Sequence, residues 1–380
     1  MGEKHTIKFY PVDNADTTLI KLHDKTTILI DCQFREGEEN SDGVKIFPVK
    51  EDLLSSIEKD SSGNPFVDLF INTHAHNDHC LGFEKNFYNG DPKDYKKGNS
   101  DNEEIIIGEL WITQMVFTYE HCKDGLAIRR EVHRRKRLFE NKTPGWDSYG
   151  NRLRIIGYNE NDTTVEGLHY LPGTFVDIIN GSKKETFFIF IHAPFKHSLV
   201  SAQANKDLNQ TSVVFQANFK TNKDGAVISR VMIGGDADHY TWEQVLNKSK
   251  EKNNTDRLEW DLFLSPHHCS WSFFNDRPHE DNPDPKDYSL EILDYRKANA
   301  HIIASSKKIE NEEPNPPHYA AKQEYVKKIG ESKFKNTAIH KDENAPQPLI
   351  YTIDDSGFEL DKSIVSAGAS LTSKPTPRAG

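Results

Sequence analysis

Three histidines and one aspartate lie close together directly after a strand-like segment. Phe66–Asn72 is mostly apolar and runs into Thr73-His74-Ala75-His76-Asn77-Asp78-His79. Imidazole and carboxylate groups are ligands that suit zinc, manganese or iron. On an extended strand end His74 and His76 point the same way and can bind one metal, while Asp78 and His79 at the following turn can reach a second. A solvated polar loop is the alternative, but the density of ligands favours a metal site.

One loop cannot complete two coordination shells, so further ligands are expected at other strand ends. Asp236 follows the apolar run Val231–Ile233 and two glycines, which allow a close backbone approach. A carboxylate at that position can bridge two metals. His267 and His268 follow the buried-strand pattern Asp261–Leu264, again where a strand enters a polar turn.

Composition limits the class of protein. The chain has 380 residues, a hydrophobic fraction of 35% and a formal net charge of -11. This charge argues against a protein that coats nucleic acid indiscriminately, so an anionic substrate would be met locally. No run approaches the roughly 18 apolar residues of a membrane span, and no apolar signal segment opens the chain. We therefore expect a cytoplasmic protein without membrane contact.

Strand-like and helix-like segments alternate, as is typical of one α/β domain over residues 1–365. Strand patterns are found at His5–Tyr10, Thr17–Leu22, Thr26–Asp31, Phe66–Asn72, Arg152–Gly157, Thr186–Ile191, Ser212–Phe219, Ala226–Ile233, Trp260–Leu264, His301–Ala304, Pro348–Ile353 and Phe358–Leu360. Helical spacing is found at Glu51–Lys59, Trp242–Ser249, Tyr288–Asn299 and Tyr319–Ile329. Residues 366–380 are small and polar, which predicts a disordered tail.

Residues 111–150 interrupt this alternation and predict a helical insertion with a dense basic cluster. The cluster comprises Lys123, Arg129, Arg130, Arg134, Arg135, Lys136 and Arg137. It can bind phosphates or a protein partner, and a solvated helix face explains it equally well. The four cysteines form no CxxC pair, and Cys32, Cys80 and Cys269 each adjoin a motif residue. We interpret these three as small apolar fillers.

The order of these motifs resembles the metallo-β-lactamase superfamily. The nearer resemblance is to the branch found in ComEC-type DNA-uptake (competence) proteins and in free-standing homologues. The segments that carry it, besides the histidine loop, Gly235-Asp236 and Pro266-His267-His268, are Asp13-Asn14-Ala15-Asp16, Ile28-Leu29-Ile30-Asp31, Asn209-Gln210-Thr211-Ser212, Ser305-Ser306 and Asn315 with Pro317-His318. The resemblance covers about residues 5 to 360 outside the insertion and implies an αββα sandwich.

The resemblance also implies roles for individual residues. His74 and His76 would hold one metal, and the second would be held by Asp78, His79 and His268, with Asp236 bridging. His267 would face the substrate's oxyanion or phosphate. Asp31 would fix a metal-binding loop from behind. His318, after two prolines, is a weaker candidate for substrate contact.

Two departures from the family pattern affect these expectations. The glycine that usually follows the histidine pair is Cys269 here, and the histidine segment that completes the first metal site in lactamase-like relatives is absent. His192, His197 or Asn209 can take its place, and the sequence does not choose among them.

The expected chemistry is hydrolysis with two divalent cations, zinc first and manganese as the alternative. Such a pair lowers the pKa of a bridging water, and the resulting hydroxide attacks in line. Asp78 or Asp236 would orient it, and His267 would stabilise charge or protonate the leaving group. A phosphodiesterase or nuclease is the leading expectation. The alternatives are a small-molecule phosphoesterase, for cyclic nucleotides or phosphorylcholine-like groups, and a partner-binding module with a degenerate site.

Overall fold

Ten strands, most of them from the N-terminal half of the chain, build the first sheet of the computed structural model. The model describes residues 4–96, 103–117, 122–157, 165–196, 208–311 and 315–362, so the predicted tail at 366–380 lies outside the described residues. The strand order is β20-β19-β1-β2-β3-β6-β7-β8-β9, with β5 paired to β6. The strands are β1 (His5–Phe9), β2 (Thr18–Lys21), β3 (Thr27–Ile30), β5 (Glu58–Lys59), β6 (Pro65–Ile71), β7 (Ile106–Thr113), β8 (Arg152–Ile156), β9 (His169–Tyr170), β19 (Leu349–Asp354) and β20 (Gly357–Leu360).

A second sheet has the order β10-β13-β14-β15-β16-β17-β18. Its strands are β10 (Phe175–Val176), β13 (Phe187–Ala193), β14 (Val214–Lys220), β15 (Val227–Ile233), β16 (Trp260–Leu264), β17 (Arg296–Ala304) and β18 (Phe334–Asn336). Two shorter pieces, β11 (Ile178–Ile179) and β12 (Ser182–Lys183), pair with each other, and β4 (Cys32–Gln33) lies beside Cys80 and Leu81.

The two sheets share one pattern of strand directions. In the first sheet β1, β2 and β3 pair antiparallel in that order, whereas β3, β6, β7 and β8 are mutually parallel. In the second sheet β13, β14 and β15 repeat the antiparallel part, and β15, β16, β17 and β18 repeat the parallel part. In each sheet one strand, β3 or β15, has an antiparallel neighbour on one side and a parallel neighbour on the other.

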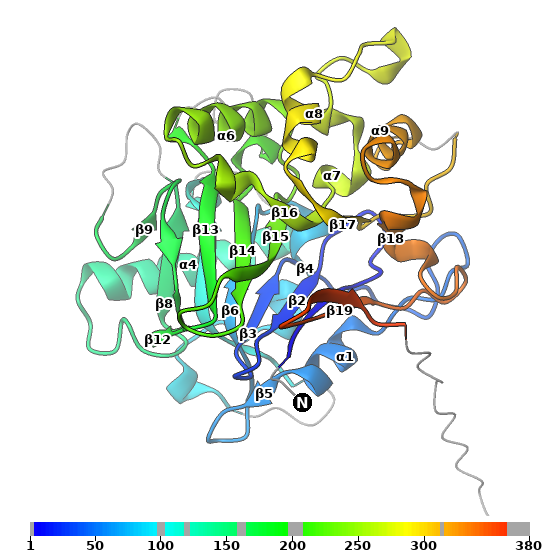
Figure 1. Cartoon of the computed structure of the whole chain (residues 1–380). Coiled ribbons are helices and arrows are strands. Elements are labelled where there is room, and N and C mark those ends of the chain that lie inside the picture. The colour runs from blue at the N-terminus through cyan, green and yellow to red at the C-terminus, as the bar shows by residue number, and fades with distance from the viewer. Residues whose placement is uncertain are drawn as a thin grey trace, which may run out of the picture.

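Three apolar cores hold four layers together. One core lies between the sheets, a second between the first sheet and the helices α1 and α4, and a third between the second sheet and α6, α8 and α9. Figure 1 shows α6, α8 and α9 gathered on one side of the molecule. The helices are α1 (Val49–Ser56), α2 (Asn77–Cys80), α3 (Phe83–Asn86), α4 (Lys123–Glu140), α6 (His239–Glu251), α7 (Pro266–Cys269), α8 (Asp287–Asp294) and α9 (Tyr319–Ile329). Short 3-10 turns occupy Pro92–Asp94, Gln114–Phe117, Asn209–Thr211, Thr255–Leu258, Trp271–Phe273, His279–Asp281, Glu331–Lys333 and Thr337–Ile339.

The mixed α/β class is confirmed, and three local expectations are wrong. Trp111 belongs to β7, and α4 connects the parallel neighbours β7 and β8, so the predicted helical insertion at 111–150 is in part a regular crossover of the sheet. The helix expected over Tyr288–Asn299 ends at Asp294, and β17 begins two residues later. The helix expected over Glu51–Lys59 ends at Ser56 and is followed by β5. In the described part of the chain, no helix combines the length and apolar character needed to cross a membrane.

Candidate metal centre

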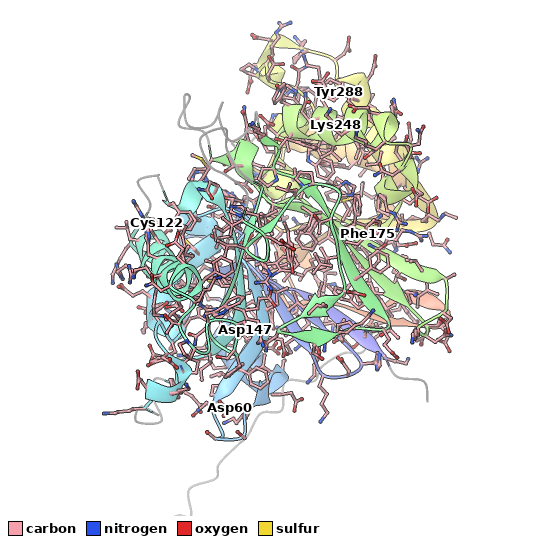
Figure 2. All side chains as sticks on the ribbon, turned by 90° about the vertical axis from the view of Figure 1, so that its left-hand side faces the viewer. Asp60, Cys122, Asp147, Phe175, Lys248 and Tyr288 are labelled. Carbon is pink, nitrogen blue, oxygen red and sulfur yellow. The ribbon has the colours of Figure 1, made fainter. Side chains whose placement is uncertain are left out.

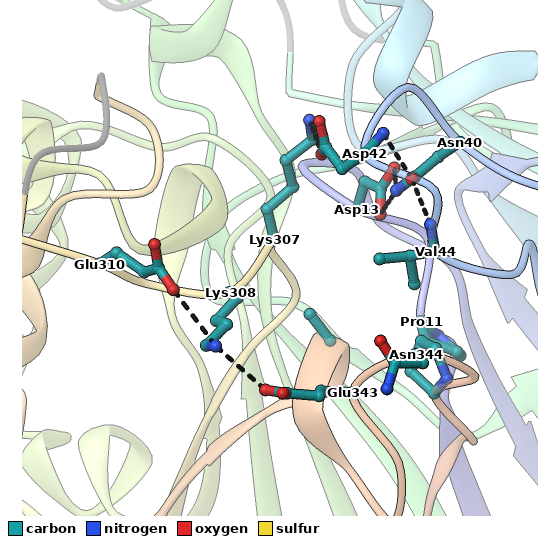
Figure 3. Close-up of a pocket in the computed structure, with 12 residues that line it drawn as sticks. Pro11, Asp13, Asn40, Asp42, Val44, Lys307, Lys308, Glu310, Glu343 and Asn344 are labelled. Atoms are coloured by element: carbon teal, nitrogen blue, oxygen red, sulfur yellow. Dashed lines mark hydrogen bonds and ion pairs between the residues drawn. The ribbon is translucent and has the colours of Figure 1, made fainter.

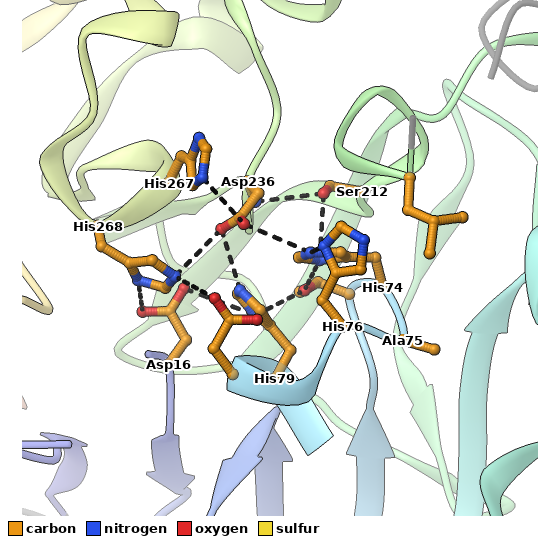
Figure 4. A network of polar contacts seen from close by, with 12 residues as sticks. Asp16, His74, Ala75, His76, His79, Ser212, Asp236, His267 and His268 are labelled. Atoms are coloured by element: carbon orange, nitrogen blue, oxygen red, sulfur yellow. Dashed lines mark hydrogen bonds and ion pairs between the residues drawn. The ribbon is translucent and has the colours of Figure 1, made fainter. Parts of the chain in front are cut away.

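The predicted ligands meet where strands of both sheets end. Asp31 follows β3 and the histidine loop follows β6, its parallel neighbour. Asp236 follows β15 after two glycines, and the histidine pair follows β16, again a parallel neighbour. Since parallel strands end at the same edge of a sheet, the topology brings these polar ends together. Figure 4 shows the side chains converging on one centre.

Asp236 divides the centre into two groups of ligand atoms. Its Oδ2 lies 3.4 Å from Nε2 of His74, which lies 3.1 Å from Nδ1 of His76. Its Oδ1 lies 3.0 Å from Nε2 of His79 and 3.5 Å from Nε2 of His268. Each oxygen of this buried carboxylate therefore faces a different set of imidazoles. Asp236 accordingly belongs to both groups of described residues that could hold a metal ion.

Two buried atoms at this centre make no hydrogen bond although they are close to each other. These are Nε2 of His79 and Oδ1 of Asp236, at the distance given above. Buried polar atoms are normally satisfied by a hydrogen bond, and an unmet pair aimed into one space calls for a specific explanation. A cation coordinated by both atoms supplies one, so the residues present fit a metal.

Asp31 holds His79 from behind. Its Oδ2 lies 2.8 Å from Nδ1 of His79, and it accepts hydrogen bonds from the backbone N–H and hydroxyl of Thr73 and from the amide of Asn72. A carboxylate at Nδ1 keeps the proton there and leaves the lone pair of Nε2 facing the centre. Asp31 thus fixes the orientation of the His79 ring and of the loop that carries it.

Asp16 is a buried site residue that the sequence analysis missed. Its oxygens lie 3.8 Å from Nδ1 of His268 and 3.9 Å from Nδ1 of His79, and the four residues Asp16, His79, Asp236 and His268 form a group that could hold a metal. However, Nε2 of both histidines faces Asp236, so Asp16 lies on their opposite side. We therefore assign it a positioning role that acts through its charge, since Nδ1 of His268 makes no hydrogen bond and Asp16 lies beyond hydrogen-bond distance. Burial raises the pKa of Asp16 to about 6, against the lowering effect of the nearby histidines.

The mutual charges of the centre are strong. Burial alone would lower the pKa of His79, but Asp236, Asp31 and Asp78 raise it well above its usual value. Conversely, burial would raise the pKa of Asp236, but the facing histidines hold it well below its usual value. The ionised carboxylates thus depend on positive charge beside them, which in a loaded site a cation would provide.

Asp78 and His267 lie on the more open side. Asp78 has a side chain that is 35% exposed, and its Oδ2 lies 3.3 Å from Nε2 of His268. The pKa of Asp78 is lowered, since His79 and His268 outweigh the opposing effect of burial. His267 is 23% exposed, and its Nε2 lies 3.7 Å from Oδ2 of Asp236.

A chain of hydrogen bonds fixes the ring of His267. Ser270 donates to the side-chain oxygen of Asn315, Ser272 donates to Ser270, and the hydroxyl of Ser272 lies 3.0 Å from Nδ1 of His267. Because both hydroxyl protons are used along this chain, Nδ1 of His267 must be the donor to Ser272. Neutral His267 therefore presents the lone pair of Nε2 to the centre.

The backbone that carries the histidine pair is unusual. His267, His268 and Cys269 have φ values of 50°, 52° and 68°, a left-handed conformation that costs free energy for residues other than glycine. Cys269 thus stands in a conformation that the family's glycine would adopt without strain. On the facing loop Gly235 is needed, because a Cβ there would lie 2.7 Å from Oγ1 of Thr73.

Of the three substitutes proposed for the missing third histidine, the structure excludes one. His192 is buried elsewhere with its Nε2 3.0 Å from the carbonyl of Arg257, so its proposed role as a ligand is wrong. Asn209 begins the 3-10 turn before Ser212, and its role as a ligand stays a prediction. His197 lies outside the described residues. His318, at the start of α9, has its ring against Trp271 and His279, and it is in neither group.

The basic cluster of α4 is largely paired within the protein. Arg135 is buried and bonded to Glu131 and to two backbone carbonyls. Arg134 also pairs with Glu131. Further pairs are Lys123 and Arg130 with Glu84, and Lys136 with Glu140. Most of the charges that suggested a phosphate-binding face are therefore partly neutralised.

A separate polar cavity of about 260 Å³ opens beside the loop that precedes β2 (Figure 3). Its lysines are paired, Lys307 with Asp42 at 2.7 Å and Lys308 with Glu310 and Glu343 at 3.2 Å and 3.0 Å. This internal pairing gives no reason to assign an anionic ligand to the cavity.

In comparisons with known proteins, neither a family model nor a curated protein matched this chain.

Proposed function

We propose that this chain is a hydrolase of the metallo-β-lactamase superfamily that uses two divalent cations and acts on phosphodiesters. The observation that carries the proposal is the division of Asp236, whose Oδ2 faces His74 and whose Oδ1 faces His79 and His268. A carboxylate between two imidazole-rich groups is suited to bridge a pair of cations.

The architecture supports the family assignment. Two face-to-face sheets with helices on both outer faces correspond to the expected αββα sandwich. The ligands also come from strand ends in the order that the resemblance implies, first the histidine loop, then Asp236, then His268. The ComEC-like branch remains the nearer candidate within the superfamily.

His74 and His76 would hold one cation, and His79, His268 and Asp78 the other. We propose zinc, with manganese as the alternative, because imidazole is the dominant ligand. Bound there, the cations would supply Lewis acidity, which activates water and stabilises negative charge on the substrate. Asp31 and Asp16 would keep His79 and His268 turned towards the centre.

Asp78 and His267 are the groups placed to handle protons. Oδ2 of Asp78 lies on the open side of the centre, where it can accept a hydrogen bond from an attacking water. Nε2 of His267 faces the first group and can take up a proton, then donate it to the departing oxygen. Both side chains are partly exposed, so a substrate can reach them.

Two considerations support the proposed substrate class: the reaction that a pair of cations favours, and the pairing of the basic side chains on α4. Two cations across one oxygen suit the in-line displacement of a phosphodiester. A nucleic acid would require unpaired basic side chains along its path, and much of the α4 cluster pairs internally. This pairing favours the second candidate, a small-molecule phosphoesterase. The convergence of the ligands argues against a partner-binding module with a degenerate site.

The test measures metal content and hydrolysis in the same preparations. Zinc or manganese is added to chelator-treated protein, unbound metal is removed, and bound metal is measured by mass spectrometry. We expect about two ions per chain and hydrolysis of bis(p-nitrophenyl) phosphate that a chelator abolishes. Asp236→Asn should lose both properties, whereas His133→Gln, on α4 away from the centre, should keep them.

A reconstituted protein that retains no stoichiometric metal would refute the proposal. Full metal loading without hydrolysis of any of a panel of phosphodiesters, phosphomonoesters and nucleic acids would refute the substrate class. Hydrolysis of small diesters but not of DNA or RNA would select the small-molecule phosphoesterase.

A further inference from the structure

Two cysteine sulfurs meet directly beside the histidine loop. Cys80 is the last residue of α2 and Cys122 is the residue that caps the start of α4, and their Sγ atoms lie 3.4 Å apart. A disulfide needs a separation of about 2.05 Å, so the sulfurs need only a short approach to bond. Because the two cysteines are 42 positions apart in the sequence, no spacing motif reveals this contact.

Cys122 is the more reactive of the two. It is half-buried, and its sulfur accepts a hydrogen bond from the backbone N–H of Gly125 at 3.4 Å. The N-terminus of this 18-residue helix favours a thiolate. Its hydrogen bonds, first from Cys80 and then from the backbone, lower the pKa of Cys122 to about 7. Figure 2 places Cys122 at the side of the molecule, beside α4.

Cys80 is the resolving partner. It is fully buried, so an oxidant in solution reaches Cys122 first. The sulfur of Cys80 lies 3.0 Å from the carbonyl oxygen of His76, so its one hydrogen can be donated either there or to Cys122. The sulfur of Cys122 lies 4.0 Å from the carbonyl oxygen of Ala75. Both sulfurs thus contact the backbone of the loop that carries the proposed ligands.

We propose that Cys80 and Cys122 are a redox modification site, which an intramolecular disulfide closes when the protein meets a hydroperoxide. The thiolate of Cys122 attacks one peroxide oxygen, the O–O bond breaks, and a sulfenic acid and one water result. The sulfur of Cys80 then attacks the sulfur of Cys122, the S–O bond breaks and a second water leaves. Two thiols and one hydrogen peroxide give one disulfide and two waters. A thiol such as dithiothreitol reverses the bond by exchange.

The disulfide also changes the loop. It removes the one hydrogen that Cys80 can donate to the carbonyl of His76, so in the oxidised protein this loop carbonyl has no hydrogen bond from Cys80. Insofar as the proposed function holds, oxidation lowers the zinc affinity of the centre several-fold. The disulfide itself forms whether or not the centre binds metal.

The experiment treats the reduced, metal-free full chain with hydrogen peroxide, blocks remaining thiols by alkylation and maps peptides by mass spectrometry. We expect a cross-linked peptide pair containing Cys80 and Cys122, which dithiothreitol releases. Cys80→Ser and Cys122→Ser should each abolish the cross-link. Serine retains a hydroxyl in place of the thiol, so the side chain can still make a hydrogen bond. Cys269→Ser, at a buried cysteine away from the pair, should retain the cross-link.

Sulfinic acid at Cys122 without a cross-link, or a cross-link from Cys80 to Cys32 instead, overturns the proposal. Zinc affinity is then compared between the oxidised and reduced protein by competition with a chromogenic chelator. Equal affinity in the two states overturns the effect on the loop. A protein that forms the cross-link but binds no zinc when reduced contradicts the proposed function and leaves the modification site standing.

Discussion

His79 and Asp236 lie with Nε2 and Oδ1 3.0 Å apart in the buried centre, yet they make no hydrogen bond with each other. The relationship joins a loop of the first sheet to a loop of the second. It also places a ligand nitrogen beside a ligand oxygen where both side chains are closed off from solvent.

Replacement of Asp236 should affect both cations. Asp236→Asn keeps the size of the side chain but removes the charge that faces both groups. We expect bound zinc to fall from about two ions per chain to less than one. Since bound metal stabilises the native state, zinc should no longer raise the melting temperature. Metal analysis and thermal melts with and without zinc check this.

Substitutions of the positioning carboxylates Asp16 and Asp31 should differ in their effect on the stability of the metal-free protein. Asp16→Asn leaves a group of similar shape behind His268 and should weaken zinc binding by about 10- to 100-fold, as carboxylates behind metal ligands usually do. Asp31→Asn should weaken zinc binding and also lower the stability of the metal-free protein, because Asp31 accepts from the backbone and hydroxyl of Thr73. Zinc titration and urea unfolding of both variants measure the difference. Equal zinc affinity in wild type and Asp16→Asn would contradict the role given to Asp16.

Arg135 should be structural. Arg135→Met leaves Glu131 and two carbonyls with fewer partners in a buried place, which should cost about 3–5 kcal/mol of unfolding free energy. Lys123→Gln removes a charge from an exposed pair of the same helix and should leave the unfolding free energy almost unchanged. Denaturant unfolding gives both values. A small effect of Arg135→Met would show that this part of α4 is less tightly packed than its contacts indicate.

His192 should make stability depend on pH. Burial lowers its pKa from 6.5 to about 4, and its Nε2 bonds the carbonyl of Arg257. Between these pH values the unfolded chain binds the proton and the folded chain does not, so the contribution of His192 is present above pH 6.5 and is lost as pH falls towards 4. The full shift corresponds to roughly 3 kcal/mol. Unfolding free energies of wild type and His192→Gln between pH 7 and 4 should converge as pH falls.

The sequence predicted most strands and the histidine loop, because local patterns carry that information. It missed β7, whose eight residues are all buried and so lack the alternation that marks a half-exposed strand. It missed Asp16, which precedes β2, whereas the histidines that it contacts follow β6 and β16, far away in the sequence. It also counted Arg135 as part of a basic surface cluster. The partner Glu131 lies one turn away on the same helix, but spacing in the sequence does not reveal that both side chains are buried.

The shared strand pattern of the two sheets has a mechanical consequence. Each sheet contributes an incomplete set of ligands from equivalent positions, and Asp78 and His268, which meet across the centre, are 190 positions apart in the sequence. A cation held between them would act as a non-covalent cross-link that closes a very long loop and clamps the open end of the sandwich. Loss of metal would then loosen the contact between the two sheets, and this would begin at the loops that carry the proposed ligands.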